Sequence, residues 1–428
     1  MEGLIVAPIT VSGGAVAVVR LSGVGAWAAA AQVFHPWPQD VVPRFALYGH
    51  FSHGDDGIAL PFVEGASYTG EESVELSCHG SPASVRMLVE KCLDAGARMA
   101  EPGEFTLRAF MNGRMDLTQA EGVRASVEAL SDAQLRQASL LREGTLKGQV
   151  SSIRSILISV LASVEAATDF EEETGPLNRP VAIARLQAAS LELGALLDQA
   201  PGSRLTREGV TVAILGRPNA GKSSLLNALA GFQRAIVTPH AGTTRDLLEA
   251  DVQIEGHLFH LVDTAGLREA TDEVEKIGVR LSKESSQNSD LVLYVFDRTI
   301  GWSKDDDLFS QTGRPTLVVA NKSDQPGDQH GIEVSALTGE GIKTLRQAMV
   351  SSTGLTARPG LTLPRHVPLL ESAREAVCAA QTTFESDHPS DLAAVHLQAG
   401  IRALGLVLGE AVTPDILHQV FADFCVGK

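Results

Sequence analysis

Residues 216–224 read Gly-Arg-Pro-Asn-Ala-Gly-Lys-Ser-Ser, which has the composition and spacing of a P-loop. The apolar run 210–215 precedes the loop, and 225–229 follows it with helical spacing, so a strand, a loop and a helix are expected in that order. In such a loop the backbone N–H groups and the helix N-terminus surround the phosphates, Lys222 reaches the β and γ phosphates, and the Ser223 hydroxyl ligates Mg²⁺. The stretch predicts a doubly wound α/β unit that binds a nucleoside triphosphate.

The base is predicted from a second stretch about a hundred residues further on. The apolar run 317–320 leads into Asn321, Lys322, Ser323 and Asp324. The Asp324 carboxylate can accept hydrogen bonds from both N1–H and the exocyclic amine of guanine, a donor pair that adenine lacks. Val-Ser-Ala-Leu at 334–337 fits the short loop whose backbone amide contacts the guanine oxygen. We therefore expect GTP.

Two further stretches fit the Mg²⁺ and γ-phosphate side of such a site. Asp263 follows the apolar run 258–262 and opens Asp-Thr-Ala-Gly at 263–266, which places its carboxylate at the Mg²⁺ shell and the Gly266 amide near the γ phosphate. Gly-Thr-Thr-Arg-Asp at 242–246 supplies a switch threonine, Thr244, as a second protein ligand to Mg²⁺. Each stretch alone is weak evidence for a function, but five such stretches in this order within about 120 residues are specific to a GTPase.

The position that carries a water-orienting glutamine in Ras-like enzymes holds Leu267, which has no hydrogen-bonding side chain. Another group must then orient the attacking water. Four acidic residues follow within 268–276, although such a run is also typical of a solvated helix start: Glu269, Asp272, Glu273 and Glu275. No arginine finger is identifiable in the same chain.

Two stretches outside the GTPase module resemble the tRNA-modification GTPase MnmE (TrmE) family. Residues 101–121 read Glu-Pro-Gly-Glu-Phe-Thr-Leu-Arg-Ala-Phe-Met-Asn-Gly-Arg-Met-Asp-Leu-Thr-Gln-Ala-Glu, similar to the signature stretch of that family. Residues 424–428 read Phe-Cys-Val-Gly-Lys, similar to its terminal Cys-x-Gly-Lys. The resemblance covers nearly the whole chain.

The resemblance implies a catalytic device that fills the gap at Leu267. In the family a K⁺ ion replaces the arginine finger when two GTPase domains meet. In this sequence the implied K⁺ ligands are Asn219 and the backbone oxygens of Thr238, His240 and Thr243. Glu275 is the implied residue that orients the attacking water, and Lys222 and Asn219 are the other implied catalytic residues. The implied GTP-binding residues are Asn219, Ala220, Gly221, Lys222, Ser223, Ser224, Thr238, Pro239, His240, Ala241, Gly242, Thr243, Thr244, Asp263, Thr264, Ala265, Gly266, Asn321, Lys322, Ser323, Asp324, Ser335, Ala336 and Leu337.

The resemblance also implies a tetrahydrofolate site, for the 5,10-methylene or 5-formyl form, in the N-terminal unit. Its residues here are Arg20, Glu75, Arg114 and Lys428, which would supply two cations for a glutamate tail and a carboxylate for the paired N–H donors of the pterin. Arg114 stands where the family usually has a lysine, and Thr-Val-Ser-Gly-Gly at 10–14 replaces its usual Pro-Pro-Gly-Arg-Gly. Cys425 is a possible functional thiol, with a packed or surface thiol as the alternative.

As a whole, the resemblance implies a K⁺- and Mg²⁺-dependent GTP hydrolase that forms a homodimer. With an MnmG (GidA)-type FAD protein in a heterotetrameric complex, it would modify the wobble uridine (position 34) of certain tRNAs at C5 by aminomethyl or carboxymethylaminomethyl addition. One alternative is a regulatory or ribosome-assembly GTPase that acts as a binding switch, against which the absence of a Gly-x-x-Gly loop after the module weighs. Another is a folate-dependent transferase in which hydrolysis is incidental.

Composition limits the other classes. The 428 residues carry a formal net charge of −17, so we expect no global basic face, and tRNA would bind through a local patch or a partner. The four cysteines show no metal or disulfide spacing. Neither a leader nor a run of about 18 apolar residues occurs, so we expect a cytoplasmic protein without a membrane span.

The periodicity of the chain divides it into four predicted ranges. Residues 1–113 carry short strand-like runs and one helical stretch, as an α+β folate-binding and dimerisation domain would. Residues 114–206 and 354–428 have helical spacing and form the two parts of one helical domain, the second ending in the Cys-x-Gly-Lys motif. The Ras-like GTPase domain, 207–353, is inserted between them. The predicted fold class is multidomain α/β plus α.

Overall fold

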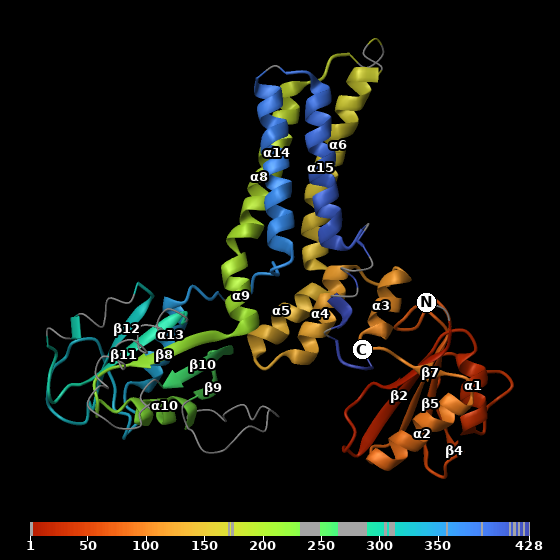
Figure 1. Cartoon of the computed structure of the whole chain (residues 1–428), viewed down its shortest axis with the longest axis horizontal. Helices are drawn as coiled ribbons and strands as arrows, with labels where there is room; N and C mark the ends of the chain where they lie inside the picture. The colour runs from red at the N-terminus through yellow and green to blue at the C-terminus, as the bar shows by residue number, and fades with distance from the viewer. Residues whose placement is uncertain are drawn as a thin grey trace, which may run out of the picture. The chain divides into compact units, whose positions relative to one another are not determined.

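The chain forms two compact units, each built from separate stretches of sequence. The computed structural model describes residues 3–169, 172, 175–231, 249–263, 289–303, 306–307, 313–356, 358–386, 388–410, 412–413, 417, 420–422 and 424–427. One unit comprises Met1–Arg124, Leu141–Leu186 and Glu375–Lys428, and the other Ala125–Leu140 and Gln187–Arg374. Figure 1 shows the elements.

A seven-stranded sheet with helices forms the N-terminal part of the first unit. Among the described strand pairs of this sheet, all are antiparallel except the pair formed by Ile5–Pro8 and Arg98–Met99, which is parallel. The strands in spatial order are β3 (Phe34–His35), β4 (Leu47–Phe51), β5 (Asp56–Phe62), β6 (Ser73–His79), β2 (Val16–Ser22), β1 (Ile5–Pro8) and β7 (Arg98–Met99). The helices are α1 (Ala26–Val33), α2 (Pro82–Asp94) and α3 (Glu104–Met111).

Side chains alternate between the two faces of this sheet, as the period of two along a strand requires. On one face Ala17, Leu76 and Cys78 are buried in a core with residues of α1 and α2, such as Ala30 and Leu88. The side chains that alternate with these residues along β2 and β6 point to the opposite face, and most of them are half-buried or exposed, such as Glu75, Ser77 and His79. The opposite face has a smaller core at β1, where Ile5 and Ala7 pack with Phe105 of α3, and is exposed at Tyr48 of β4 and Ile58 of β5.

Long helices follow the N-terminal sheet in sequence and return after the second sheet. Their bounds are α4 (Leu117–Glu128), α5 (Asp132–Arg142), α6 (Thr145–Asp169), α8 (Arg179–Asp198), α9 (Ala200–Glu208), α14 (His366–Glu385) and α15 (Ser390–Leu408). Within the first unit, α6 packs along α15. It buries a stripe at spacings of three and four, which is the apolar face of an amphipathic helix: Leu146, Val150, Ile153, Leu157, Val160 and Val164.

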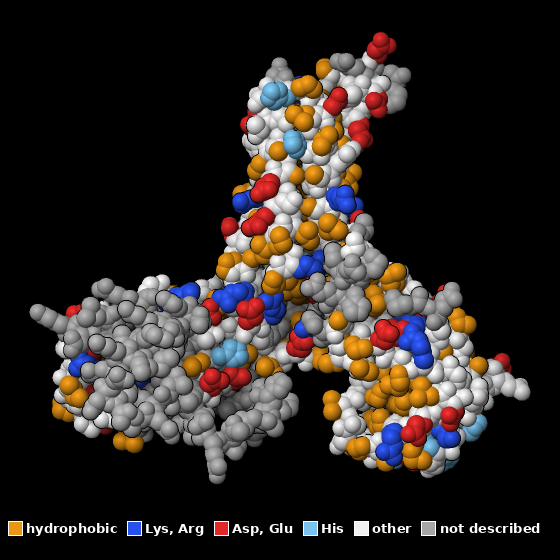
Figure 2. All heavy atoms as spheres, viewed as in Figure 1, with side chains coloured by type: hydrophobic (Ala, Val, Ile, Leu, Met, Phe, Trp, Pro, Cys, Tyr) orange, Lys and Arg blue, Asp and Glu red, His pale blue; other side chains and the backbone are white. Residues whose placement is uncertain are grey.

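By length and composition alone, three helical stretches of the described chain could cross a membrane: Thr145–Asp169, Arg179–Glu208 and Ser390–Leu408. Length and composition do not test the expectation of a chain without a membrane span, which stays a prediction. It rested on uninterrupted apolar runs, whereas the mean hydropathy of a helix tolerates interspersed polar residues. Hydrophobic side chains also reach the surface along these helices (Figure 2), among them Ile158 at 44% and Val395 at 61% exposure.

A six-stranded sheet forms the core of the second unit. In spatial order its strands are β13 (Ile332–Glu333), β12 (Thr316–Asn321), β11 (Leu291–Asp297), β8 (Val210–Leu215), β10 (His257–Asp263) and β9 (Glu249–Ile254). All its pairings are parallel except that of β9 with β10. The central strands β8 and β11 run as buried, mostly apolar stretches, because helices such as α10 (Lys222–Gly231) and α13 (Ile342–Ser352) supply the packed layers of the sheet.

The multidomain α/β plus α fold class predicted from the sequence is confirmed by these two sheets and the long helices. The four predicted ranges stay a prediction. The compact units divide the predicted helical domain: most of α5, the second half of α8, α9 and the start of α14 are grouped with the six-stranded sheet. The Ala133 N–H donates to the Gly256 carbonyl oxygen at the β9–β10 turn, and the Gln134 amide donates to the Arg207 carbonyl oxygen.

Candidate nucleotide-binding site

The P-loop between β8 and α10 adopts backbone conformations that its sequence allows. Asn219 has φ of 63°, a left-handed conformation that asparagine tolerates better than most residues. Gly221 has φ of 87°, and a Cβ atom there would lie 2.2 Å from the Asn321 side-chain nitrogen. At Gly216 a Cβ would lie 1.9 Å from the Val295 carbonyl oxygen. Glycine at the two ends of the loop is thus required by close approach of neighbouring strands.

Lys222 is the first residue of α10 and is almost fully buried. Its ammonium group donates to the carbonyl oxygens of Gly216, at 2.9 Å, and Arg217, at 2.8 Å, so the side chain folds back over the loop. An ammonium held there, next to the N-terminus of a helix, makes the concave side of the loop electropositive. This is the geometry that binds a polyphosphate.

Ser223 and Asp263 meet beside the loop. The Ser223 hydroxyl donates to a carboxylate oxygen of Asp263 at 2.6 Å, and Asp263 is 2% exposed at the end of β10. A hydroxyl and a carboxylate are the hard oxygen donors that Mg²⁺ prefers, and few protein ligands suffice because Mg²⁺ retains water. The pair fits a Mg²⁺ ion shared with the phosphates. Ser224, the next residue of α10, is exposed.

Asn321 joins the phosphate side of the site to the base side. Its amide nitrogen donates to the Ala220 carbonyl oxygen at 2.9 Å, and its amide oxygen accepts from the Ala336 N–H at 3.1 Å. The side chain is 2% exposed, so both hydrogen bonds are shielded from water. Residues predicted in three separate stretches therefore meet around one amide.

The predicted base-recognition residues lie on two adjacent loops. A carboxylate oxygen of Asp324 accepts from the Ser335 hydroxyl at 2.6 Å, and the Ser323 N–H donates to the Val334 carbonyl oxygen at 2.9 Å. These contacts hold the acidic side chain beside the Ser-Ala-Leu loop. Leu337 is 87% exposed, which leaves an apolar side chain at the edge of the site for a flat base.

Two supporting ion pairs were not predicted from the sequence. Lys322 pairs with Asp297, the last residue of β11. Burial raises the pKa of Asp297, but the hydrogen bonds from Lys322 and Thr299 lower it overall. The available signal was position, because Asp297 ends a buried parallel strand at the edge where ligands bind. Arg217 pairs with Asp306, which is 0% exposed.

The remaining predicted residues of this site lie outside the described residues. They are Thr238, Pro239, His240, Ala241, Gly242, Thr243, Thr244, Thr264, Ala265, Gly266 and Glu275. Their roles in binding GTP, Mg²⁺ or K⁺, or in orienting water, stay predictions.

Two of the predicted folate residues are brought together on the N-terminal sheet. Arg20 on β2 and Glu75 on β6 are register partners, and the guanidinium donates to one carboxylate oxygen at 2.7 and 3.1 Å. The guanidinium also lies over the rings of Tyr68, 4.7 Å from the centroid, and Phe105, at 5.4 Å. This is a cation held between aromatic faces and a carboxylate, suited to a planar ring and an anion.

The other predicted folate residues are placed separately. Arg114 donates to the Gly65 carbonyl oxygen at 3.0 Å. Exposed Cys425 lies near α3, where its carbonyl oxygen accepts from the Gly103 N–H. Gly427 packs against the Pro8 carbonyl oxygen at the end of β1, and Lys428 lies outside the described residues.

Three features together define a P-loop GTPase: the P-loop, the contact of Ser223 on α10 with Asp263 at the end of β10, and the Asn-Lys-Ser-Asp loop on a mostly parallel sheet. Residues 4–114 match the family described as GTP-binding protein TrmE N-terminus, and residues 117–425 match the MnmE helical domain. The chain belongs to the tRNA modification GTPase MnmE family.

Curated relatives match over nearly their whole length. The tRNA modification GTPase MnmE of Thermus thermophilus is 41% identical, over 97% of this chain and 96% of that protein. The protein of the same name from Acaryochloris marina is 38% identical over the same shares. Among solved structures, an Era variant from Aquifex aeolicus bound to GDP and AlF₄⁻ is 26% identical over 39% of this chain and 66% of that chain, with a TM-score of 0.27.

Proposed function

We propose that the chain is a K⁺-dependent GTPase that modifies the wobble uridine of certain tRNAs at C5 as a homodimer in the cytoplasm. It would act with an MnmG-type FAD protein and take the added carbon from a tetrahydrofolate. The observation that carries the proposal is the similarity to tRNA modification GTPases over 97% of the chain, together with the phosphate, Mg²⁺ and guanine residues gathered around Asn321.

In hydrolysis the residues of this chain would bind and orient the nucleotide. The backbone of the P-loop and Lys222 hold the phosphates, while Ser223 and Asp263 hold Mg²⁺, which neutralises charge on the β and γ phosphates. Asp324 selects guanine by accepting its paired N–H donors. Glu275 orients the attacking water, since Leu267 has no hydrogen-bonding group.

A K⁺ ion would be held by Asn219 and by backbone oxygens of Thr238, His240 and Thr243. Such a cation supplies positive charge where it develops on the phosphates, without reorganisation during the reaction. Because the family places the ion at the meeting of two GTPase domains, hydrolysis would depend on their pairing.

The test is GTP hydrolysis by the purified chain in K⁺ and in Na⁺ at equal ionic strength. We expect a rate at least about tenfold higher in K⁺, a difference of roughly 1.4 kcal/mol in barrier. Glu275→Ala should lose that stimulation, while Glu273→Ala, a neighbouring acidic residue, should keep it. Equal rates in both salts would contradict the K⁺ and Glu275 assignments and favour the binding-switch alternative.

Tetrahydrofolate would bind in the N-terminal domain near Arg20 and Glu75. The contact of Gly427 with Pro8 supports a place for the Lys428 ammonium at the same sheet. We expect Lys428→Ala to abolish tetrahydrofolate binding in calorimetry and to leave GTP turnover unchanged. Unchanged folate affinity would contradict the assigned pocket.

The tRNA step is tested by nucleoside analysis. In cells that lack their own enzyme of this family, the chain should restore the C5-modified uridine in digested tRNA, and Asp324→Ala should not. The net charge of −17 favours delivery of tRNA through a local patch or the partner protein. A chain that hydrolyses GTP in K⁺ but restores no modification would support the regulatory alternative.

A further inference from the structure

Polar side chains form a row across three neighbouring strands of the N-terminal sheet. His50 on β4 is the register partner of Asp56 on β5. The antiparallel register of β5 with β6, in which Ile58 faces Ser77, places Asp56 opposite His79 when it is continued by one pair of residues on the same face. Tyr48 and Ile58, on the same face of β4 and β5, are exposed, so these side chains can meet a ligand from solvent.

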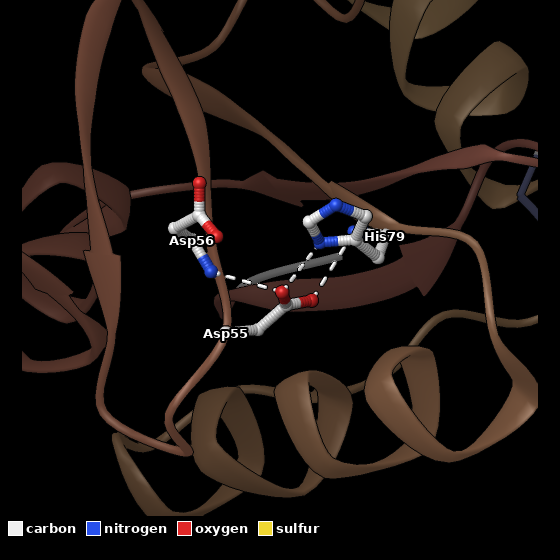
Figure 3. A group of neighbouring side chains, drawn as sticks. All are labelled: Asp55, Asp56 and His79. Atoms are coloured by element: carbon white, nitrogen blue, oxygen red, sulfur yellow. Dashed lines mark hydrogen bonds and ion pairs between the residues drawn. The ribbon is translucent and has the colours of Figure 1, made fainter.

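His79 is held in one orientation by Asp55, which lies in the turn before β5 (Figure 3). The His79 Nδ1–H donates to Asp55 Oδ1 at 2.6 Å, and the His79 backbone N–H donates to Oδ2 at 3.1 Å. Because a carboxylate only accepts, this contact assigns the proton to Nδ1, and the neutral imidazole then has its lone pair on Nε2 for another partner. The His79 side chain is 66% exposed.

Asp55 is itself fixed from its buried side. The Ser84 hydroxyl donates to Asp55 Oδ2, and His53 Nε2 lies 3.3 Å from the Ser84 oxygen. The His53 side chain is 3% exposed, and its Nδ1 has no hydrogen-bond partner among the described residues. Burial raises the pKa of Asp55, but hydrogen bonds from Ser84 and His79 lower it to about 2, so the carboxylate stays ionised.

The arrangement has the form of a metal site with a supported histidine. Each of Asp55, Asp56 and His79 offers a ligand atom, and these atoms lie within 4.8 Å of one another. Histidines that bind metals commonly donate their other ring N–H to a carboxylate, which orients the ring and raises its basicity. Asp56 is also oriented, since it accepts from the Tyr48 hydroxyl at 2.8 Å.

We propose that His79 Nε2 and the Asp56 carboxylate bind a divalent transition metal ion, with Asp55 as the residue that positions His79. His50, the register partner of Asp56, lies outside the group of ligand atoms within 4.8 Å and would turn toward the ion as the third ligand. Imidazole and carboxylate together suit Zn²⁺, Co²⁺ or Ni²⁺, whereas Mg²⁺ and Ca²⁺ prefer oxygen ligands alone. Three protein ligands on an open sheet face leave the fourth position to water. The site is separate from the Ser223–Asp263 pair, which has only oxygen donors.

A second histidine–aspartate pair provides a matched control. His260 Nδ1 lies 2.6 Å from Asp251 Oδ1, the same separation as in the His79 pair. Its Nε2, however, lies 2.8 Å from the Glu208 carbonyl oxygen and is therefore already engaged. The proposal predicts metal binding at His79 and none at His260.

The experiment is calorimetric titration of Zn²⁺ into the full chain, with excess Mg²⁺ to fill the phosphate site and with exposed thiols alkylated. We expect one high-affinity Zn²⁺ per chain. His79→Gln should weaken binding by at least about 100-fold, Asp55→Asn by about 10 to 100-fold, and His260→Gln should have no effect. Titration with Co²⁺ should give the visible absorption of a low-coordinate ion, altered in Asp55→Asn.

Circular dichroism shows whether each variant is folded. If His79→Gln is not, His50→Gln, at an exposed position, replaces it and should lower affinity at least about tenfold. The proposal would be overturned if the wild-type chain failed to bind one Zn²⁺ per chain, or if His79→Gln and His260→Gln bound Zn²⁺ with equal affinity. GTP hydrolysis, measured in parallel, should be the same in all these variants.

Discussion

Replacing Glu104 with glutamine removes a buried negative charge at the start of α3. The carboxylate is 2% exposed and accepts hydrogen bonds from Arg98 at 2.5 and 2.8 Å, from Arg108 at 2.8 and 3.2 Å, and from the Glu101 N–H at 2.9 Å. Arg108 is 3% exposed and also bonds to Glu71. The variant would leave Arg108 buried with half of its compensating charge, which we expect to destabilise the N-terminal domain.

The size of the effect follows from the pKa of this carboxyl. Burial alone would raise it, but the hydrogen bonds from Arg98, the Glu101 backbone and Arg108 lower it from 4.5 to about 2. A carboxyl whose pKa is lower in the folded than in the unfolded state stabilises the fold fully at pH values above the unfolded-state pKa. This stabilisation is lost as the pH falls from there through the folded-state pKa. The shift corresponds to about 3 kcal/mol at pH 7 and about 2 kcal/mol near pH 3.5.

The assay is urea unfolding followed by tryptophan fluorescence in a Trp302→Phe background. The two remaining tryptophans, Trp27 and Trp37, both pack against the N-terminal core and report on that domain. Glu104→Gln should lower its free energy of unfolding by about 3 kcal/mol at neutral pH, and the difference from wild type should narrow as pH falls from about 4.5.

Glu101→Gln is the matched control, because Glu101 is exposed and three residues away. It should change the free energy of unfolding by less than about 0.5 kcal/mol. Equal stability of Glu104→Gln and Glu101→Gln at neutral pH, or a difference that widens with acid, would refute the reasoning.

Three further substitutions test the two sites. Gly221→Ala would place a Cβ 2.2 Å from the Asn321 amide nitrogen at a φ of 87°, so GTP affinity, measured with a fluorescent analogue, should fall at least about tenfold. Asp324→Asn should reverse the hydrogen-bonding pattern at the base and raise the ratio of xanthosine to guanosine triphosphate turnover at least about tenfold. Gly427→Ala would place a Cβ 2.0 Å from the Pro8 carbonyl oxygen, so calorimetric tetrahydrofolate affinity should fall while GTP turnover is unchanged. An unchanged value in any of these measurements would contradict the contact concerned.

The elements that the sequence predicts well are those whose chemistry is local. Strand β8, the P-loop and α10 are consecutive, and each has its own periodic or glycine signal, so their place could be read in advance. The fold class followed from the same kind of signal. The run 225–229, for which helical spacing was expected, lies within α10 (Lys222–Gly231).

What the sequence did not predict depends on register and on long-range packing. The row of His50, Asp56 and His79 exists because three strands pair in one particular register, which no single strand encodes. The double hydrogen bonding of Asn321 joins loops about a hundred residues apart in sequence. Helix α5 has the same period as its neighbours, yet it contacts the β9–β10 turn, because its docking depends on backbone groups such as the Gly256 carbonyl.

The contact of Gly427 with Pro8 has a consequence for the order in which the protein is made. The two residues are about 420 positions apart, so at about 5 to 20 residues per second the ribosome adds the second roughly 20 to 80 s after the first. The Pro8 end of β1 therefore gains this contact only when the last residues of the chain are made, after the GTPase unit has been synthesised. A nascent chain stalled after that unit would carry the nucleotide site and an N-terminal sheet in which the end of β1, a strand between β2 and β7, still lacks its contact with Gly427.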